Sequence, residues 1–493
     1  MLRRKIFLVT VSIAIVAVLF LAGCQGNLPL TPTSSASTPR VEAKSGGVDL
    51  TVYNQNMALV KDKRTLSLKS GTNEVRFTDV ASQIDPTSVQ FSSITDPSGT
   101  RVLEQNYAYD IVGSAKILQK YLDQNISIVT EDGTKYSGKL LSGSDDIILQ
   151  ADDGQVTTVK LARVRDLKFP SLPGGLITKP TLIWLLNSSK EGNQDVQVTY
   201  MTNGINWKAN YVVVLNKDDT AMNLNGWVTI DNQSGATYED ANLKLVAGDV
   251  KRVTPAPAPV GAGAAPSATA KSADAQFVQQ DVFEYKLYSL QRPTTIQNRE
   301  TKQIEFTSAA NAGVNKLLIY DGGSAYRFYG YQITDANYGK TSGTKVAVMI
   351  EFKNSEANKL GMPLPKGTIR VYKADADGSN QFVGENNIDH TAKDEMIRLN
   401  IGNAFDVVGE RTQTNFTKVN DRTYEETYQI KVRNHKTEAV EVRVVEHLFR
   451  WSNWQIIKTT QDYVKTDAQT MEFRVKVAPD AEQVVNYTVR YSW

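Results

Sequence analysis

Histidine and cysteine, the usual zinc ligands and the side chains best suited to nucleophilic or proton-transfer chemistry near neutral pH, number only three and one in this chain of 493 residues. Zinc sites usually combine His and Cys ligands at short spacings such as His-x₃-His, and no two histidines here lie that close. One histidine has acidic neighbours and could form a metal site with them in space, or simply lie in a polar turn between strands, and we expect the turn. That group is His390 with Asp389, Asp394 and Glu395, and the other histidines are His435 and His447.

Signals of covalent or acid–base catalysis are also weak. The chain has no Gly-x-Ser-x-Gly motif, although a Ser-His-Asp triad is defined by geometry and stays open as an alternative. A glycosidase needs two carboxylates ~5–9 Å apart across a cleft. Strand alternation would place Asp145 and Asp146 on opposite faces of a sheet. A second acidic set, in the sequence DRTYEET, comprises Asp421, Glu425 and Glu426.

Gly-containing motifs point to turns more than to ligands. Asp375, Asp377 and Gly378 resemble the start of a calcium loop but lack the later glutamate, so they predict a turn. No glycine-rich stretch ends in Gly-Lys-Ser, which excludes the common phosphate-binding loop. We therefore expect no catalytic residues, no metal and no cofactor.

Aromatic residues near the C-terminus are the candidates for ligand contact. The sequence LFRWSNWQI contains Phe449, Trp451 and Trp454. If exposed, Trp451 and Trp454 could stack on sugar rings or anchor a protein partner. The alternative is that both tryptophans belong to a core at strand ends.

The single cysteine indicates where the protein acts. Three basic residues and an apolar run precede the tetrad Leu21-Ala22-Gly23-Cys24, which is the order of a secretory signal. The tetrad resembles a bacterial lipobox, a resemblance that implies cleavage between Gly23 and Cys24 and lipid on Cys24. The alternative is an uncleaved membrane anchor, and both place the rest of the chain outside the cytoplasm.

Composition is that of an ordinary soluble chain, with 41% hydrophobic and 22% charged residues. The formal charge of +2 falls to −1 once residues 1–23, with their three basic and no acidic side chains, are removed. A chain so close to neutral argues against a nucleic acid as partner.

The positions of strand, turn and linker signals predict a mainly β protein made of antiparallel β-sandwich domains. One helix and about five short strands, with turns at Asp132-Gly133 and Asp153-Gly154, resemble a small barrel of the Sm or SH3-like type inserted into the first sandwich. A Pro/Ala-rich linker is expected to be disordered and either separates two domains or connects two strands of one. The predicted segments are a signal peptide 1–23, a flexible tether 24–47, sandwich 48–110, barrel 111–170, sandwich 171–253, linker 254–280 and C-terminal sandwich 281–493.

Several stretches, in one order, resemble a bacterial envelope family of unknown function that is described as mucoidy-inhibitor-like. They are TVYNQNMALVKDKRTLSLKSGTNEVRF, INWKANYVVVLN, GWVTIDNQSGATYEDANLKLVAGDV, LGMPLPKGTIRVYKADADG, GENNIDHTAKDE and NYTVRYSW. The resemblance implies β-sandwich architecture and an envelope location, and it supplies no catalytic residues.

These observations favour a lipid-anchored, extracytoplasmic scaffold that binds or supports and does not catalyse. Its expected partners are the membrane, through Cys24, and an envelope protein or polysaccharide. One alternative is an envelope hydrolase, a glycosidase or peptidase with acids or His390 in its site. Another is an adhesin-like module that binds carbohydrate or protein through Trp451 and Trp454.

Overall fold

The computed structural model describes residues 45–171, 173, 176–248, 250–251 and 276–493. The predicted signal peptide, the lipidation site Cys24 with Gly23, and nearly all of the tether lie outside the described residues. Most of the predicted linker also lies outside them, but its last residues begin a strand. Within the described part, no helix is both long and apolar enough to cross a membrane.

The first sheet joins strands from both sides of the predicted linker. Apolar residues alternate with polar ones along its central strands, so that one face is buried. Its order is β16 (Phe277–Val282), β17 (Tyr285–Leu290), β15 (Tyr238–Ala247), β1 (Ser45–Tyr53), β2 (Met57–Leu68), β12 (Gly192–Asn203) and β4 (Gln90–Ser93), and β18 (Thr294–Ile296) also pairs with β15.

A second, smaller sheet is built around a strand that follows the predicted barrel. Trp184 of this strand is fully buried against Phe77 and Phe91, with ring centroids 5.3 Å apart in both pairs. The order is β3 (Gly71–Thr78), β11 (Thr181–Ser188) and β5 (Thr100–Ala108). A short 3₁₀ helix, η1 (Pro86–Ser88), precedes β4.

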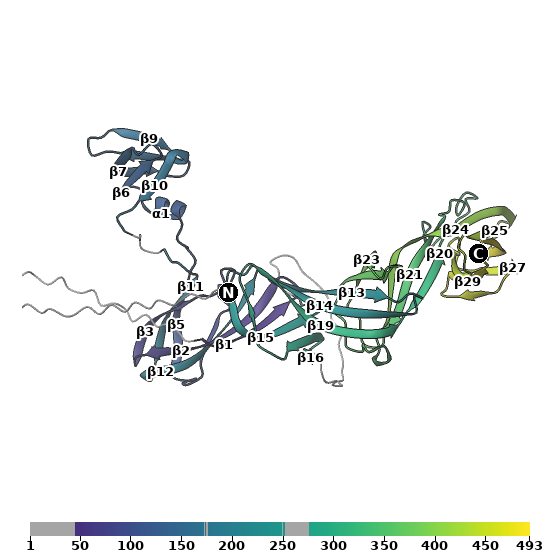
Figure 1. Cartoon of the computed structure of the whole chain (residues 1–493), viewed down its shortest axis with the longest axis horizontal. Coiled ribbons are helices and arrows are strands. Elements are labelled where there is room, and N and C mark those ends of the chain that lie inside the picture. Colours follow the sequence, from purple (N-terminus) through teal and green to yellow (C-terminus); the bar gives the residue numbers. More distant parts are fainter. Residues whose placement is uncertain (1–44, 172, 174–175, 249, 252–275) are drawn as a thin grey trace, which may run out of the picture. The chain divides into compact units, whose positions relative to one another are not determined.

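The inserted unit has the predicted element order of one helix and five strands (Figure 1). Both Asp-Gly turns are confirmed, because Gly133 and Gly154 have positive φ and each lies between paired antiparallel strands. Leu118, Ile128 and Leu140 help form a core of its own. The elements are α1 (Ser114–Lys120) and a sheet in the order β10 (Val164–Lys168), β6 (Asn125–Thr130), β7 (Lys135–Ser142), β8 (Asp146–Gln150) and β9 (Val156–Lys160), with 3₁₀ helix η2 (Leu161–Arg163) joining β9 to β10.

A mixed sheet carries strands from the middle and from the C-terminal part of the chain. β13 alternates strictly, so that Trp207, Ala209 and Tyr211 are buried while Lys208 is exposed. The order is β19 (Glu300–Gly313), β14 (Ala221–Asn232), β13 (Ile205–Leu215), β22 (Gly367–Ala374) and β23 (Asn380–Ile388). These buried residues join those of the first two sheets in one continuous core, the first core.

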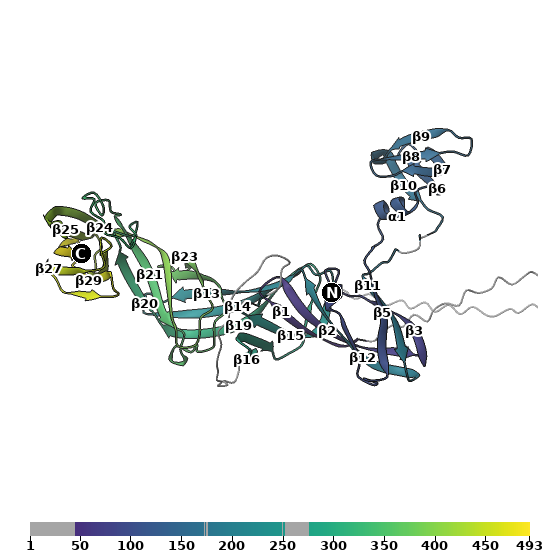
Figure 2. The ribbon, with the colours of Figure 1, turned by 180° about the vertical axis from the view of Figure 1, so that it is seen from behind.

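The last sheet forms a separate, second core. Two of its strands contribute to both cores: on β24, Ile397 and Leu399 belong to the first and Val407 to the second. The strands β20, β21 and β24 lie side by side in both views (Figures 1 and 2). The order is β27 (Trp454–Thr459), β30 (Ala481–Ser492), β25 (Thr423–Asn434), β24 (Met396–Asn420), β21 (Lys345–Lys353), β20 (Asn315–Tyr320), β26 (Val440–His447), β29 (Thr470–Val477) and β28 (Tyr463–Lys465), with 3₁₀ helix η3 (Glu356–Asn358) after β21.

The structure confirms the mainly β fold class and refines it. Most strand pairs are antiparallel, and the parallel exceptions are β1–β15, β13–β22 and β20–β26. The division into domains differs from the predicted one, because the strands β16 to β19, β22 and β23 complete sheets begun before residue 253. The linker therefore connects two strands of one sheet, which was the alternative left open.

Candidate binding site

The outer face of β22 and β23 carries a ladder of polar and aromatic pairs. On β22, Ile369 and Val371 point into the first core, so the alternate residues Thr368, Arg370 and Tyr372 must face the other way. Strand register places a β23 residue opposite each of them. The pairs are Thr368–Asn387, Arg370–Glu385 and Tyr372–Phe382.

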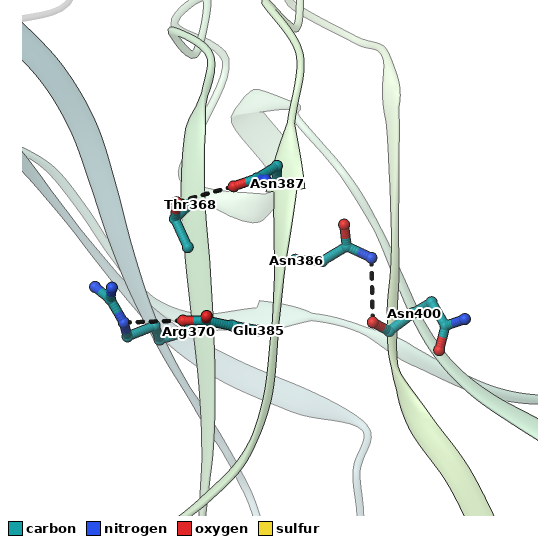
Figure 3. A pocket seen from close by; sticks show the side chains of 6 residues that line it. All are labelled: Thr368, Arg370, Glu385, Asn386, Asn387 and Asn400. Carbon is teal, nitrogen blue, oxygen red and sulfur yellow. Dashed lines mark hydrogen bonds and ion pairs between the residues drawn. The ribbon is translucent and has the colours of Figure 1, made fainter.

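The first two of these pairs border an open hollow of about 450 Å³, which we call the polar hollow (Figure 3). Within it, the Thr368 hydroxyl donates to Oδ1 of Asn387 over 2.9 Å. Nδ2 of Asn386 donates to the backbone oxygen of Asn400, on β24, over 3.1 Å. The polar hollow is lined by Thr368, Arg370, Glu385, Asn386, Asn387 and Asn400.

The two charges in the polar hollow neutralise each other. Nε of Arg370 lies 3.1 Å from Oε2 of Glu385, and the side chains are 43% and 51% exposed. An ion pair this exposed contributes ~0–1 kcal/mol to stability. The pair therefore leaves the hollow rich in hydrogen-bonding groups and without net charge.

A glycine sets the closeness of β23 to β24 beside the hollow. A Cβ atom added to Gly384 would overlap the backbone carbonyl of Ile401. The two strands approach here although they share no regular ladder. Only a residue without a side chain fits this position.

A second group of residues whose side chains could take part in chemistry lies inside the second core. Strand alternation turns Glu426 of β25 and Glu446 of β26 inward, where both are almost fully buried. Each pairs with a buried arginine: Glu446 with Arg411 over 2.8 Å, and Glu426 with Arg450 over 2.8 Å. We call these four side chains the anchor cluster.

Tyrosine hydroxyls complete the anchor cluster. Tyr428 donates to Glu426 over 3.0 Å, and Tyr487 donates to Glu446. Burial raises the pKa of both tyrosines, so both stay protonated and remain donors. Burial by itself would lower the pKa of Arg450, but its hydrogen bond and ion pair with Glu426 raise that pKa above the ordinary value.

The anchor cluster fixes the chain segment between β20 and β21. The guanidinium of Arg450 donates to the backbone oxygens of Ile333, Asp335 and Tyr338. Arg411 donates to the backbone oxygen of Gly339. The space left among these groups is about 10 Å³, which is no more than one water needs. The cluster is thus a closed anchor for backbone and has no room for a substrate.

The anchored segment presents aromatic side chains to solvent. Residues 326–331, of sequence YRFYGY, form what we call the aromatic loop. Phe328, Tyr329 and Tyr331 are 39%, 57% and 59% exposed. The rings of Tyr329 and Tyr331 stack with centroids 5.8 Å apart, and Tyr326 packs on Tyr338, whose backbone Arg450 holds.

His447 ties the start of the same segment to β26. Its Nε2 lies 3.0 Å from Oδ2 of Asp321. This hydrogen bond raises the pKa of His447 above its usual value, against the lowering effect of partial burial. The imidazole stacks on Phe449 with ring centroids 4.7 Å apart. The pair therefore supports the anchored segment from one side.

The tryptophans predicted to contact a ligand are partly buried. Trp451 and Trp454 both pack against the second core. The indole N–H of Trp454 donates to the backbone oxygen of Ala468, and Lys465 lies 4.7 Å from its ring centroid. Most of their surface is thus used in packing. They are neither fully exposed, as a ligand-binding pair would be, nor fully buried, as core residues would be.

The other predicted candidates are dispersed. Nδ1 of His390 accepts a hydrogen bond from the backbone N–H of Lys366, and the side chain of Asp375 caps a turn through the N–H groups of Asp377 and Ser379. No group of His, Cys, Asp and Glu suited to a metal ion occurs among the described residues. The acids pair with single cations: Asp146 with Lys160, Asp421 with Lys418, and Glu425 with Arg490.

Sequence reasoning missed both the polar hollow and the aromatic loop. The doublet Asn386-Asn387 lies in the stretch GENNIDH, where a polar, turn-like composition hides a strand. The aromatic loop had a usable signal, because aromatic residues that dense between two strands are unusual for a connection.

Comparison with known proteins places most of the chain in one family. Residues 196–493 match the family described as a domain of unknown function, DUF4139. No curated protein matches the chain. The matched range includes the polar hollow, the anchor cluster and the aromatic loop.

Proposed function

We propose that this chain, which belongs to the DUF4139 family of unknown function, is a lipid-anchored binding scaffold of the bacterial cell envelope. It acts on the outer side of the membrane and catalyses no reaction. Its partner is a macromolecule of the envelope, met by the C-terminal half of the chain.

The observation that carries this proposal is the aromatic loop on its buried ionic anchor. Burying two arginine–glutamate pairs has a large desolvation cost, and apolar residues of similar volume would often stabilise a core as well or better. Here the arginines hold backbone oxygens of a connection whose aromatic side chains stay exposed. Tyr, Arg and Gly on a pre-ordered loop are the composition of protein recognition surfaces.

The state of the ionisable groups supports binding over catalysis. A general acid or base must reach a substrate and have a suitable pKa. Glu426 and Glu446 are instead engaged by arginine and tyrosine in a space too small for a ligand. His390 accepts a backbone hydrogen bond, and His447 pairs with Asp321 at the anchored segment.

The proposal of a lipid anchor rests on the lipobox-like tetrad that ends at Cys24. Several acyl chains at one residue would hold the protein firmly, because each buried CH₂ contributes ~0.8 kcal/mol. Cells labelled with a palmitate analogue should mark the wild-type protein and leave Cys24→Ala unmarked. Equal labelling of both proteins would contradict the anchor.

Binding by the aromatic loop is tested in intact cells with a photo-reactive amino acid in the full chain. Placed at Tyr329, it should give an adduct of discrete mass with an envelope component. The matched control is Tyr109, which is 70% exposed and lies outside the loop. Adducts of equal yield at both positions, or none at Tyr329, would overturn the proposal.

A further inference from the structure

We propose that the polar hollow on β22, β23 and β24 is a binding site for a neutral saccharide. This inference rests on the proposed binding function and gives it a ligand class. It concerns a surface separate from the aromatic loop, and it follows from the charge, the hydrogen-bonding groups and the neighbouring aromatic ring of the hollow.

The paired charges of the polar hollow make it a poor site for an ionic ligand. Arg370 and Glu385 are within 3.1 Å of each other and about equally exposed. An anion drawn to Arg370 would meet the carboxylate of Glu385, and a cation drawn to Glu385 would meet the guanidinium. The remaining lining groups, Thr368 and the asparagines, carry no charge. A neutral polar ligand is repelled by neither the carboxylate nor the guanidinium.

The hydrogen-bonding groups match hydroxyls, which both donate and accept. Asn387 uses its Oδ1 to accept from Thr368, and Oδ1 of Asn400 accepts from the N–H of Gly402. Asn400 faces the hollow with its backbone oxygen, and its side-chain amide points away from the other lining residues (Figure 3). Within the described residues, Nδ2 of Asn387 makes no hydrogen bond, so one amide donor borders the hollow. Beside it, Glu385 offers acceptor lone pairs and Arg370 offers further donors, as adjacent sugar hydroxyls require.

An exposed aromatic ring lies on the next rung of the same ladder. Phe382 is 56% exposed and packs on Tyr372 with ring centroids 5.6 Å apart. Two residues of a strand span ~6.6 Å, so this ring and the Arg370–Glu385 pair are about one sugar ring apart. A ring face beside polar groups is the combination that holds the apolar and the hydroxylated sides of a saccharide.

The test is native gel electrophoresis of the full chain in detergent, through gels containing one dissolved polysaccharide each. Dextran, laminarin and hydroxyethyl cellulose are the neutral probes, and alginate and polygalacturonate are the anionic ones. We expect at least one neutral polymer to retard the protein and the anionic polymers to have no effect. Phe382→Ala and Asn387→Asp should each weaken that retardation at least tenfold.

Phe283→Ala is the matched control, because Phe283 is 85% exposed outside the hollow; it should be retarded like the wild type. Thermal melts of each variant establish that it folds. Retardation only by anionic polymers, none by any neutral polymer, or equal retardation of wild type and Phe382→Ala would overturn the inference. If the photo-adduct at Tyr329 persists while the gels fail, only the saccharide site is lost and the binding function stands.

Discussion

At the scale of single residues, the second core depends on charges that most cores avoid. Arg450 is 1% exposed and pairs with Glu426. Removing one partner leaves the other charge buried and unpaired, which typically costs about 3–5 kcal/mol. We therefore expect Arg450→Met to lower the free energy of unfolding by about that amount in urea denaturation.

A surface arginine on β25, the strand that carries Glu426, supplies the control for this prediction. Arg433 pairs with Glu410 and Glu482 while remaining 32% exposed. Arg433→Met should change the free energy of unfolding by no more than ~1 kcal/mol. The double variant Arg450→Met with Glu426→Gln should lose less than the sum of the single variants, since the two residues interact directly. Additive losses would show that the pair is not coupled.

The pairing of His447 with Asp321 predicts a dependence of stability on pH. The folded-state pKa of His447 is raised by that hydrogen bond, with smaller contributions from the charges of Glu446 and Asp467. Because this pKa is raised on folding, the pairing of protonated His447 with Asp321 stabilises the fold fully at pH values below the unfolded-state pKa of ~6.5. That stabilisation is lost as the pH rises through the folded-state pKa. The free-energy difference between wild type and His447→Gln should thus be larger at pH 5.5 than at pH 9.

His435 provides the comparison for the pH experiment. Its Nδ1 lies 3.7 Å from Asp480, and the two side chains are 56% and 88% exposed. His435→Gln should unfold with a free energy close to that of the wild type, because an ion pair between exposed side chains is screened by solvent. A His447→Gln difference that is flat from pH 5.5 to pH 9 would contradict the assignment.

At the scale of strands, Gly384 sets the approach of β23 to β24. A side chain there would collide with the backbone oxygen of Ile401, which cannot move as a side chain could. Overpacking of this kind costs about 1–3 kcal/mol. Gly384→Ala should lower the free energy of unfolding by an amount within that range. Because it would move β23, it should also weaken the binding of any ligand in the polar hollow.

Gly343→Ala is the matched substitution, because nothing lies within 4 Å of its added Cβ. It should shift the free energy of unfolding by less than ~0.5 kcal/mol. Both variants are compared by urea denaturation. Equal effects of the two substitutions would mean that β23 is free to move away from β24.

Strand prediction succeeded where one face is buried and failed where neither is strongly apolar. The sequence TYQIKVRN alternates and forms part of β25 with alternating burial. By contrast, β23 has almost no buried residue and was missed, although its register to β22 is continuous apart from one shift. The single helix of the inserted unit, α1, starts without a side-chain cap, because its N-cap residue is Gly113.

Site prediction from sequence was limited for a related reason. Cys24 is predicted as a lipidation site from its position after an apolar run, and it lies outside the described residues. The anchor cluster pairs Arg411 with Glu446 and Arg450 with Glu426, residues at least 24 positions apart. Register between strands decides such pairs, and no local spacing encodes it. Trp451 and Trp454 stood out only because tryptophan is rare, a property that does not distinguish packing from recognition.

At the scale of the whole molecule, the first core is one continuous cluster of buried residues from distant parts of the chain. β13 pairs with β14 on one side and with β22 on the other, more than 150 residues later. Phe277, inside the predicted boundary at residues 254–280, is buried in the first core, and that boundary followed composition alone. It does not mark where contacts end, because β15 and β17 on either side of the linker are directly paired.

The inserted unit is the one part of the described chain that this architecture lets us remove. It has its own core, and the chain leaves and rejoins the first core at one point. There, Val112 donates to Ile177 over 2.8 Å and Ile177 donates to Asp110 over 3.1 Å. Replacing residues 114–174 by Gly-Ser-Gly-Ser should thus leave the remaining fold intact, because a short linker closes adjacent ends at little entropic cost.

The measurement is thermal unfolding followed by circular dichroism, with the photo-adduct at Tyr329 as a readout of function. We expect an unchanged melting temperature for the shortened chain and an unchanged adduct. Removal of residues 367–388 should have the opposite outcome. It takes β22 away from β13 and leaves an edge of that central strand unpaired, so we expect this variant to aggregate. If the variant lacking residues 114–174 aggregates as well, the inserted unit is part of the cooperative core, and its separate cluster of buried residues does not make it independent.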